Sequence, residues 1–405
     1  FSIITGGPGT GKTTIIDGLL DVYKKYHKLN DKDPKIKEKI ALMAPTGRAA
    51  KRMKELLGMD AKTVHRHLGY NYDGLFNYDQ FNPLPHDLII CDESSMIDIF
   101  LAKKLFTSIK PNAQIVLVGD VDQLPSVGPG QVLSDMITSH AFPVVRLKEI
   151  HRQAKDSYIV KLASLVNEQK LTYDDLHTQQ DVYFYQAHHQ QIKNIIIQQV
   201  EGAIKQGYNL IEDIQVLIPM YKGEIGIDQL NLLMQKTFNP QQKASMTYKD
   251  QIFYKNDKVI QLVNDPEKMI MNGDIGFIKD ISKNEKDEPF MIVSFDENDV
   301  MYEKQDLESL SLAYAMSIHK SQGSEYKIVI MPMIKPFMHM LKKELIYTAI
   351  TRAKKFLILL GDMKLLTYAV NHISERRQTT LAQRIRDEHI KKEDNENTLS
   401  PYDFM

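Results

Sequence analysis

Short apolar runs alternate with amphipathic segments along the first part of the chain. The runs are FSIIT, KIALMAPT, DLIICDE, QIVLVGD and FPVVRLKE. After the first of them, residues 12–26 place isoleucine, leucine and tyrosine at spacings of three and four, the period of a helix with one buried face. Strands that are apolar throughout and separated by such helices are typical of a parallel sheet covered on both faces. The sequence therefore predicts an α/β domain here.

The same alternation resumes later in the chain and is then interrupted. Apolar runs suited to buried strands recur as DVYFYQ, QVLIPM, YKIVIMPM and KFLILLGD. Between the second and third of these, residues 250–306 hold short β runs joined by turns such as Asn272-Gly273, without a helical period. We therefore expect two α/β domains in tandem, with a small β-barrel inserted into the second.

These changes of pattern give the expected domain boundaries. The first domain is placed at residues 1–145, the second at 146–245 and 308–375, and the barrel at 246–307. Residues 376–405 are polar and charged, so they are expected to form a loosely ordered tail.

Composition narrows the classes of protein. Hydrophobic residues make up 43% and charged residues 25%, as in ordinary soluble proteins, and no apolar run reaches membrane-spanning length. The single cysteine, Cys91, lies in an apolar run and is expected in a core, which fits a reducing cytoplasm. The net charge of −1 does not attract polyanions globally, so nucleic-acid binding would need a local basic groove. The chain opens within a predicted strand and not on Met, which indicates an N-terminal truncation.

GGPGTGKTT at residues 6–14 fits the phosphate-loop pattern. Its glycines let backbone N–H groups surround phosphate oxygens, and the helix that begins at Lys12 adds the positive end of its dipole. Lys12 would reach the β- and γ-phosphates of ATP, and the Thr13 hydroxyl would hold Mg²⁺. The alternative is a glycine-rich turn that binds nothing, but the position between a strand and a helix favours nucleotide binding.

Two further apolar runs end in polar residues. Asp92 is placed to hold Mg²⁺ through water, and Glu93 to orient and deprotonate the attacking water. Gln123, after the run QIVLVGD, would sense the γ-phosphate or position that water. Alone, the acidic pair would be a solvated loop and Gln123 part of a Pro/Gly turn.

Arg152 in KEIHRQA and Arg352 in YTAITRAKK are candidates for stabilising charge in the transition state of phosphoryl transfer. Both are remote in sequence from the phosphate loop. They would act only if the second α/β domain faces the first across a cleft, and as lone arginines each would instead form a surface ion pair.

A series of motifs gives these residues a common context. In chain order they are GGPGTGKTT, APTGRAAKR, TVHRHLG, CDESSM, GDVDQLPSVGPG, EIHRQ, SIHKSQGSE and YTAITRAKK. Together they resemble the motifs of superfamily 1 DNA helicases, within them the RecD-like branch (SF1B) that travels 5′ to 3′, and most of all its stand-alone type without RecB and RecC partners. The resemblance extends from residue 1 to about residue 375. It implies two RecA-like P-loop domains, a β-hairpin pin called 1B and an SH3-like barrel called 2B.

The resemblance also implies roles for individual residues. Lys12, Thr13, Asp92, Glu93, Gln123, Arg152 and Arg352 would take the hydrolytic roles above. The remaining nucleotide contacts would come from Gly7, Pro8, Gly9, Thr10, Gly11, Thr14 and, near the ribose, Glu325. Single-stranded DNA would be contacted by Pro45, Thr46, Arg48, Thr63, His65, His319 and Lys320, and by Lys222 and Asn231 in a further DNA-contacting element. For His65, the sequence argues against a zinc ligand because it holds no Cys/His quartet with suitable spacing, and a helix-capping or core role stays open.

The stretch YNYDGLFNYDQF at residues 70–81 alternates aromatic and polar residues around Asp73-Gly74, which predicts a β-hairpin. It lies where the family carries its pin, at about residues 66–86. A pin would act as a wedge at the fork, with aromatic side chains such as Tyr72 and Phe76 stacking on the last base pair. The alternative is a surface hairpin whose aromatic residues pack inward. The barrel would grip the single strand.

The resemblance thus implies a cytoplasmic, monomeric, ATP- and Mg²⁺-dependent motor that moves 5′ to 3′ on single-stranded DNA and opens duplex forks, away from membranes. Two other hypotheses stay open: a nucleotide-gated DNA-binding module that opens no duplex, and the helicase part of a conjugative relaxase. The family's adenine-recognition glutamine and the extra N-terminal region of the stand-alone type are absent from this sequence.

Overall fold

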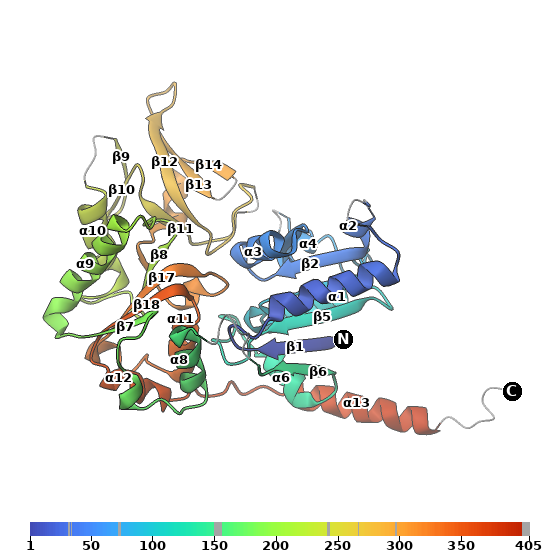
Figure 1. Cartoon of the computed structure of the whole chain (residues 1–405). Coiled ribbons are helices and arrows are strands. Elements are labelled where there is room, and N and C mark those ends of the chain that lie inside the picture. The colour runs from blue at the N-terminus through green and yellow to red at the C-terminus, as the bar shows by residue number, and fades with distance from the viewer. Residues whose placement is uncertain are drawn as a thin grey trace. The chain divides into compact units, whose positions relative to one another are not determined.

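A computed structural model covers the chain and describes all residues except 31–32, 34, 72–73, 150–155, 241–243, 266, 296–297 and 399–405; for 391–398 it describes the backbone only. The chain divides into two compact units (Figure 1). The first unit comprises residues 1–45, 49–151 and 375–405, and the second comprises 46–48 and 152–374. No helix within the described ranges is long and apolar enough to cross a membrane.

The first unit is built on a six-stranded sheet in the order β3-β2-β4-β5-β1-β6. Every pairing in this sheet is parallel. The strands are β1 (Ser2–Gly6), β2 (Ile40–Ala44), β3 (Ala61–Thr63), β4 (Leu88–Cys91), β5 (Gln114–Gly119) and β6 (Val144–Leu147). All residues of β2 and β4 are buried, as expected for apolar strands with both faces covered. The predicted parallel α/β arrangement is confirmed.

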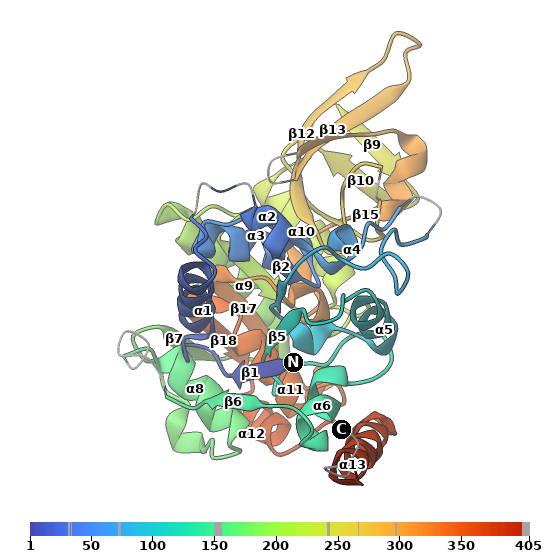
Figure 2. The ribbon, with the colours of Figure 1, turned by 90° about the vertical axis from the view of Figure 1, so that its right-hand side faces the viewer.

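Helices cover both faces of this sheet (Figure 2). Successive residues of a strand point to opposite faces, so Ile3 and Ile4 belong to different core clusters. One cluster includes residues of α1 (Lys12–Tyr26) and α3 (Gly47–Leu57), and the other includes residues of α5 (Ile99–Thr107) and α6 (Val132–Ser139). The shorter helices are α2 (Ile36–Lys39), α4 (Val64–His67) and the 3-10 turn η1 (Ser94–Met96).

The end of the chain differs from the expected loose tail. Residues Leu381–Thr398 form helix α13, which packs on α6. Leu381 and Ile385 lie against the core of the first unit, and an Nη atom of Arg386 donates to the Thr138 carbonyl oxygen at 3.4 Å. The prediction of a loosely ordered tail was wrong for this part, because Leu381 and Ile385, four residues apart, give the start of a mostly polar helix an apolar face to bury.

The second unit holds another wholly parallel sheet, in the order β16-β8-β17-β18-β7. Its strands are β7 (Val182–Gln186), β8 (Ile214–Leu217), β16 (Ala315–Met316), β17 (Tyr326–Met333) and β18 (Ala353–Gly361). The accompanying helices are α8 (Tyr158–Asn167), α9 (Ile192–Lys205), α10 (Ile227–Phe238), α11 (Lys343–Ile350) and α12 (Lys364–Val370). The 3-10 turns are η2 (Tyr173–Asp175), η3 (His189–Gln191), η5 (His319–Ser321) and η6 (Lys335–Phe337).

Antiparallel strands interrupt this series, as predicted. The pair β9 (Ser245–Tyr248) and β10 (Gln251–Tyr254) precedes a five-stranded sheet in the order β14-β13-β12-β11-β15. The members of that sheet are β11 (Lys258–Gln261), β12 (Ile275–Lys283), β13 (Pro289–Phe295), β14 (Asn298–Tyr302) and β15 (Leu310–Leu312), with the turn η4 (Lys304–Ser309) before the last strand. Short strands joined by tight turns need no helical crossover, which is why this segment lacks a helical period.

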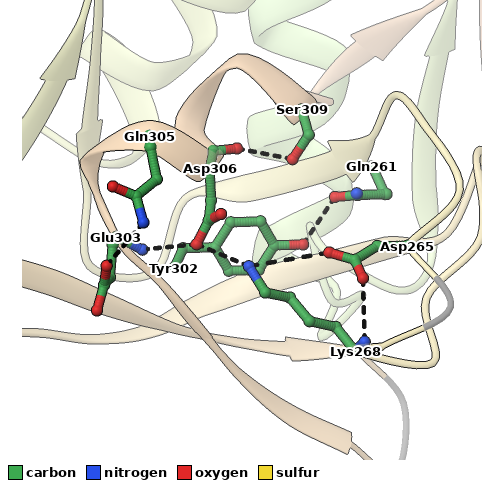
Figure 3. Close-up of polar contacts among 8 residues, drawn as sticks. All are labelled: Gln261, Asp265, Lys268, Tyr302, Glu303, Gln305, Asp306 and Ser309. Carbon is green, nitrogen blue, oxygen red and sulfur yellow. Dashed lines mark hydrogen bonds and ion pairs between the residues drawn. The ribbon is translucent and has the colours of Figure 1, made fainter. Parts of the chain in front are cut away.

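A cluster of polar contacts within this antiparallel segment joins side chains from residues 261–268 to side chains from residues 302–309 (Figure 3). The Lys268 ammonium lies 2.7 Å from an Asp306 carboxylate oxygen and 3.9 Å from an Asp265 oxygen. It also sits 4.7 Å from the ring centroid of Tyr302, whose buried hydroxyl donates to Gln261 at 2.7 Å. The cluster fastens the long connection between β11 and β12 to the turn that leads into β15.

Candidate nucleotide and nucleic-acid site

Three loops of the first unit meet at one edge of its sheet. Strands β4, β5 and β1 are neighbours and parallel, so their carboxyl ends lie side by side. The loops that leave these ends carry Asp92 and Glu93, then Gln123, and then the phosphate loop. In open α/β sheets this edge is where ligands bind. The sheet order therefore gathers the predicted nucleotide residues of the first unit, which are far apart in sequence.

The phosphate loop is closed by its own hydrogen bonds. The Thr10 hydroxyl donates to the Gly7 carbonyl at 2.8 Å, and the Lys12 ammonium donates to the Gly6 and Gly7 carbonyls at 2.6 and 3.0 Å. Gly11 is the N-cap residue of α1, and its φ of 82° places its backbone in the left-handed region. A residue with a Cβ atom adopts this region only at an energetic cost. Because no side chain caps α1, its first N–H groups are oriented for an anionic ligand.

The acidic pair lies in an unusual electrostatic environment. Burial, followed by the neighbouring charge of Glu93, raises the pKa of Asp92 to about 6, and the charges of Lys12 and Arg52 act in the opposite direction. The Asp92 carboxylate accepts from the Glu93 backbone N–H at 2.8 Å. Because Asp92 is buried and lies beside a second carboxylate, its ionised form would be stabilised by a bound cation. A carboxylate such as that of Asp92 and a hydroxyl such as that of Thr13 are oxygen donors of the kind that Mg²⁺ accepts as ligands.

Glu93 itself has a left-handed backbone, with φ at 50°. Glutamate adopts this region at a cost of about 1–2 kcal/mol, and such strain clusters at functional sites. Gln123 lies beneath the same edge with 7% of its surface exposed, and its amide nitrogen lies 3.4 Å from a carboxylate oxygen of the buried Asp120. Both residues follow strands that end at the same edge of the sheet as the strand before the phosphate loop.

The second unit holds two of the predicted nucleotide residues. Arg352 follows α11, and its guanidinium donates to the Thr348 carbonyl at 3.2 Å, the Ser324 carbonyl at 3.1 Å and the Thr351 hydroxyl at 3.2 Å. Glu325 precedes β17 and forms an ion pair with Lys354 at 3.1 Å. Arg152 lies outside the described residues.

A group of predicted DNA contacts follows, along the chain, two other strands of this sheet. Pro45, Thr46 and Arg48 come after β2, and Thr63 ends β3. The Thr63 hydroxyl accepts from the Arg66 backbone N–H at 3.2 Å and caps α4, so this side chain has a structural task.

His65 packs among aromatic rings. Its ring centroid lies 5.5 Å from that of Tyr70 and 6.0 Å from that of Phe76, and burial lowers the pKa of its imidazole. This arrangement supports the packing role that the sequence left open for His65.

In the second unit the predicted DNA contacts separate into two groups. His319 and Lys222 are exposed and Lys320 is half-buried. Asn231 is buried, its amide nitrogen donates to the Leu312 and Ala315 carbonyls at 3.1 and 3.0 Å, and its oxygen accepts from the Ala315 backbone N–H at 2.8 Å. The expectation that Asn231 contacts DNA is therefore corrected: both ends of its amide serve the backbone around β15 and β16.

The predicted hairpin is shorter than its sequence pattern suggests. Among the described residues of 70–81, pairing is limited to one antiparallel bridge between Tyr70 and Phe76, and the Asn71 backbone N–H donates to the Leu75 carbonyl at 2.9 Å. Tyr72 lies outside the described residues. Phe76 and Tyr78 pack against the core, which leaves Leu75 and Phe81 as the large apolar side chains that this stretch exposes.

Several lysines of the antiparallel segment are already paired with acids. Lys255 pairs with Asp280 at 3.3 Å, Lys279 with Asp299 at 2.5 Å, and Lys283 with Asp287 at 2.8 Å. Together with the Lys268 cluster of Figure 3, these pairs place acidic side chains beside lysines that would otherwise be available to DNA phosphates.

The site and the two sheets define a class: P-loop proteins with tandem RecA-like domains. Family comparisons then narrow it. The AAA domain family matches residues 1–129, the ATP-dependent RecD-like DNA helicase SH3 domain matches 230–295, and the UvrD-like helicase C-terminal domain matches 312–360. These matches show that the chain is related to the RecD-like DNA helicases, which confirms the resemblance that the sequence motifs indicated.

Individual relatives agree with this placement. The chain is 32% identical over 393 residues to the ATP-dependent RecD2 DNA helicase of Deinococcus radiodurans, covering 95% of this chain and 50% of that protein. It is 28% identical over 470 residues to the RecBCD enzyme subunit RecD of Haemophilus influenzae, covering 96% and 70%. The chain thus spans half the length of the Deinococcus relative.

Solved structures support the fold. A Pif1 helicase from a study of unwinding at forked dsDNA by two coordinating Pif1 helicases superposes with a TM-score of 0.54 at 18% identity, covering 97% of this chain and 93% of that chain. The Pif1 helicase of Candida albicans gives a TM-score of 0.51 at 18% identity, covering 97% and 95%.

Two arginines near this edge had no assigned role in the sequence-based prediction. Arg52 of α3 contributes positive charge at Asp92, and its position within APTGRAAKR was the available signal. Arg377 donates to the loop that carries Gln123. It lies in a polar stretch without a motif, so nothing in the sequence pointed to it.

Proposed function

We propose that this chain is an ATP-dependent translocase and helicase that moves 5′ to 3′ on single-stranded DNA. The proposal rests on one observation: the candidate nucleotide residues and the candidate DNA contacts follow different strands at the same edge of one sheet. Strands β4, β5 and β1 present the nucleotide residues, and the adjacent β2 and β3 present the candidate DNA contacts. Since all of these strands belong to one packed sheet, a change at the nucleotide end is transmitted to the DNA end through rigid elements.

The residues divide the hydrolytic work. Lys12 exchanges its bonds to the loop carbonyls for bonds to the β- and γ-phosphates, and Glu93 accepts a proton from the attacking water. Asp92 and Thr13 would hold Mg²⁺, which when bound neutralises phosphate charge. Gln123 orients the water, and Arg352 and Arg152 add positive charge from the second unit. Glu325 lies near the ribose.

DNA contacts are expected to be independent of base identity. Pro45, Thr46 and Arg48 from the first sheet edge, with Lys222, His319 and Lys320 from the second unit, would contact the phosphate backbone. Such contacts position a strand without reading its sequence, which a motor needs because every step must accept any base. The antiparallel segment at residues 246–307, as domain 2B, would hold the strand mainly through contacts other than its acid-paired lysines.

The direction of movement is tested with two partial duplexes, one with a 5′ and one with a 3′ single-stranded tail. With ATP and Mg²⁺ we expect opening of the 5′-tailed duplex only. The Lys12→Ala variant should open neither, because it lacks the cation that holds the β- and γ-phosphates. Opening of the 3′-tailed duplex alone would contradict the proposed direction. ATP hydrolysis without opening of either duplex would favour a nucleotide-gated binding module.

We propose that Phe81 acts as the wedge. Phe81 is 86% exposed and is held in a tight turn, since an Asp79 carboxylate oxygen accepts from the Phe81 and Asn82 backbone N–H groups at 2.8 and 2.9 Å. Tyr70, Phe76 and Tyr78 instead pack inward. An exposed ring on a fixed turn is suited to stack on a terminal base pair.

Phe81→Ala is therefore expected to slow unwinding about tenfold, since stacking on one base contributes about 1–3 kcal/mol. DNA-stimulated ATP hydrolysis should be unchanged, because the turn lies outside the nucleotide edge. Phe100→Ala is the matched control, because Phe100 is also exposed, at 68%, but lies on α5. Unwinding by Phe81→Ala at the wild-type rate would argue against the wedge.

A further inference from the structure

The connection from the second unit back to the first is fixed at both ends. It leaves α12, passes through residues 371–380 and enters α13. On the side of the second unit, the Lys343 backbone N–H donates to the His372 carbonyl at 2.9 Å, and the Ser374 backbone N–H donates to a Glu344 carboxylate oxygen at 3.0 Å. Both bonds are made to the first turn of α11.

On the side of the first unit, one guanidinium organises a whole loop. Arg377 donates to the backbone carbonyls of Ser126 at 2.6 Å, Gly128 at 2.5 Å and Gly130 at 2.7 Å, with the Ser126 hydroxyl at 3.5 Å. Carbonyls of alternate residues normally do not converge, so the loop must bend around this cation. The fork of a guanidinium can serve several acceptors at once, which an ammonium cannot do in the same geometry.

The loop has little room to adopt another shape. A Cβ atom on Gly128 would lie 2.1 Å from a carboxylate oxygen of Asp98, the residue that caps α5. The Ile99 backbone N–H donates to the Pro129 carbonyl at 3.0 Å. The bend that brings the carbonyls to Arg377 is thus packed against the start of α5 on its other side.

The two anchors lie next to elements of the proposed hydrolytic site. The loop held by Arg377 also carries Gln123, three residues before Ser126. The helix bonded to residues 372 and 374 is α11, after which Arg352 follows. Only Glu375 and Arg376 separate Ser374 from Arg377, so the chain between the anchors spans at most about 11 Å.

We propose that residues 372–377 form a strap that couples the Gln123 loop to α11, with Arg377 as the positioning residue. Arg377 does not touch the nucleotide: it fixes the backbone from which Gln123 reaches the site. Movement of α11 pulls on Ser374, then on Arg377 and then on the loop. The strap thereby makes ATP hydrolysis in the first unit responsive to the second. This inference rests on the proposed ATP-dependent activity.

The first test compares Arg377→Ala, Arg377→Lys and the neighbouring, exposed Arg376→Ala in steady-state ATP hydrolysis with single-stranded oligodeoxythymidine. We expect Arg377→Ala to lower kcat about tenfold with little change in the KM for ATP, as a misplaced positioning group would. Arg377→Lys should recover part of this loss, and Arg376→Ala should behave as wild type. Wild-type kcat for Arg377→Ala would overturn the proposal.

A second variant separates coupling from folding. Inserting Gly-Ser between Glu375 and Arg376 keeps both anchors but slackens the strap. We expect hydrolysis without DNA to be retained and its stimulation by DNA to fall. Full stimulation in this variant would overturn the coupling even if Arg377→Ala fails to fold. If wild-type protein hydrolyses no ATP, the proposed function itself fails; if wild type is active and stimulated but all variants match it, only the strap fails.

Discussion

Replacing Arg352 with alanine is expected to lower kcat for ATP hydrolysis by about 10³–10⁵-fold while ATP binding is retained. The reason is that a guanidinium stabilises the charge that develops on the transferred phosphoryl group and contributes less to binding of the ground state. Steady-state hydrolysis and binding of a fluorescent ATP analogue measure the two effects separately. A nucleotide-gated binding module would keep its ATP-dependent affinity for DNA in this variant, whereas a motor loses movement.

The surroundings of Arg352 call for a stability control. Its bonds to Thr348 and Ser324 tie the end of α11 to the turn before β17, so alanine also removes a structural contact. Arg352→Lys retains a cation, and Lys355→Ala removes a neighbouring cation that lies 5.9 Å from the ring centroid of Tyr208. If thermal unfolding is unchanged and kcat of Arg352→Ala remains at the wild-type value, Arg352 is structural only.

The second large effect is expected at Glu93. Glu93→Gln removes the base that accepts a proton from water and should reduce kcat by about 10²–10⁴-fold. The amide retains the shape of the side chain, so ATP should still bind. Duplex opening should be lost in parallel, because each step depends on turnover. Hydrolysis at the wild-type rate would show that another group activates the water.

The backbone of Glu93 provides an independent test. Since its φ is 50°, Glu93→Gly should relieve about 1–2 kcal/mol of left-handed strain, offset by about 0.5–1 kcal/mol of chain entropy. The glycine variant should therefore be inactive but no less stable than wild type in thermal unfolding. A clear fall in Tm would mean that the carboxylate contributes to stability and that the strain serves no separate purpose.

The α/β pattern was predictable because its determinants are local. Strands such as β2 and β4 are apolar on both faces, and α1 has one apolar face. The spacing of apolar residues in the sequence therefore matches the residues that are buried in the structure. The positions of residues 6–14 and of the acidic pair directly after buried strands were predictable from the apolar runs before them, and their chemical roles stay predictions. Their meeting at one edge followed from the parallel strand order.

Other features depend on tertiary contacts that the sequence does not display. Asn231 matched a DNA-contacting element, yet its amide bonds to backbone groups more than 80 residues away in the chain. The aromatic residues at 70–81 suggested a long hairpin, but Phe76 and Tyr78 pack against the core of the first unit. Arg377 carries no motif because backbone carbonyls, which every residue has, are its partners.

The packing of α13 on α6 has a consequence for biosynthesis. Leu381 and Ile385 complete a hydrophobic core whose other members lie between residues 3 and 144. A ribosome must therefore translate through residue 385, more than 240 residues after the rest of this core, before the first unit can finish burying its apolar surface. Chaperones would meet the first unit with this surface still exposed until residue 385 emerges, and termination before residue 381 would release a unit that exposes it permanently.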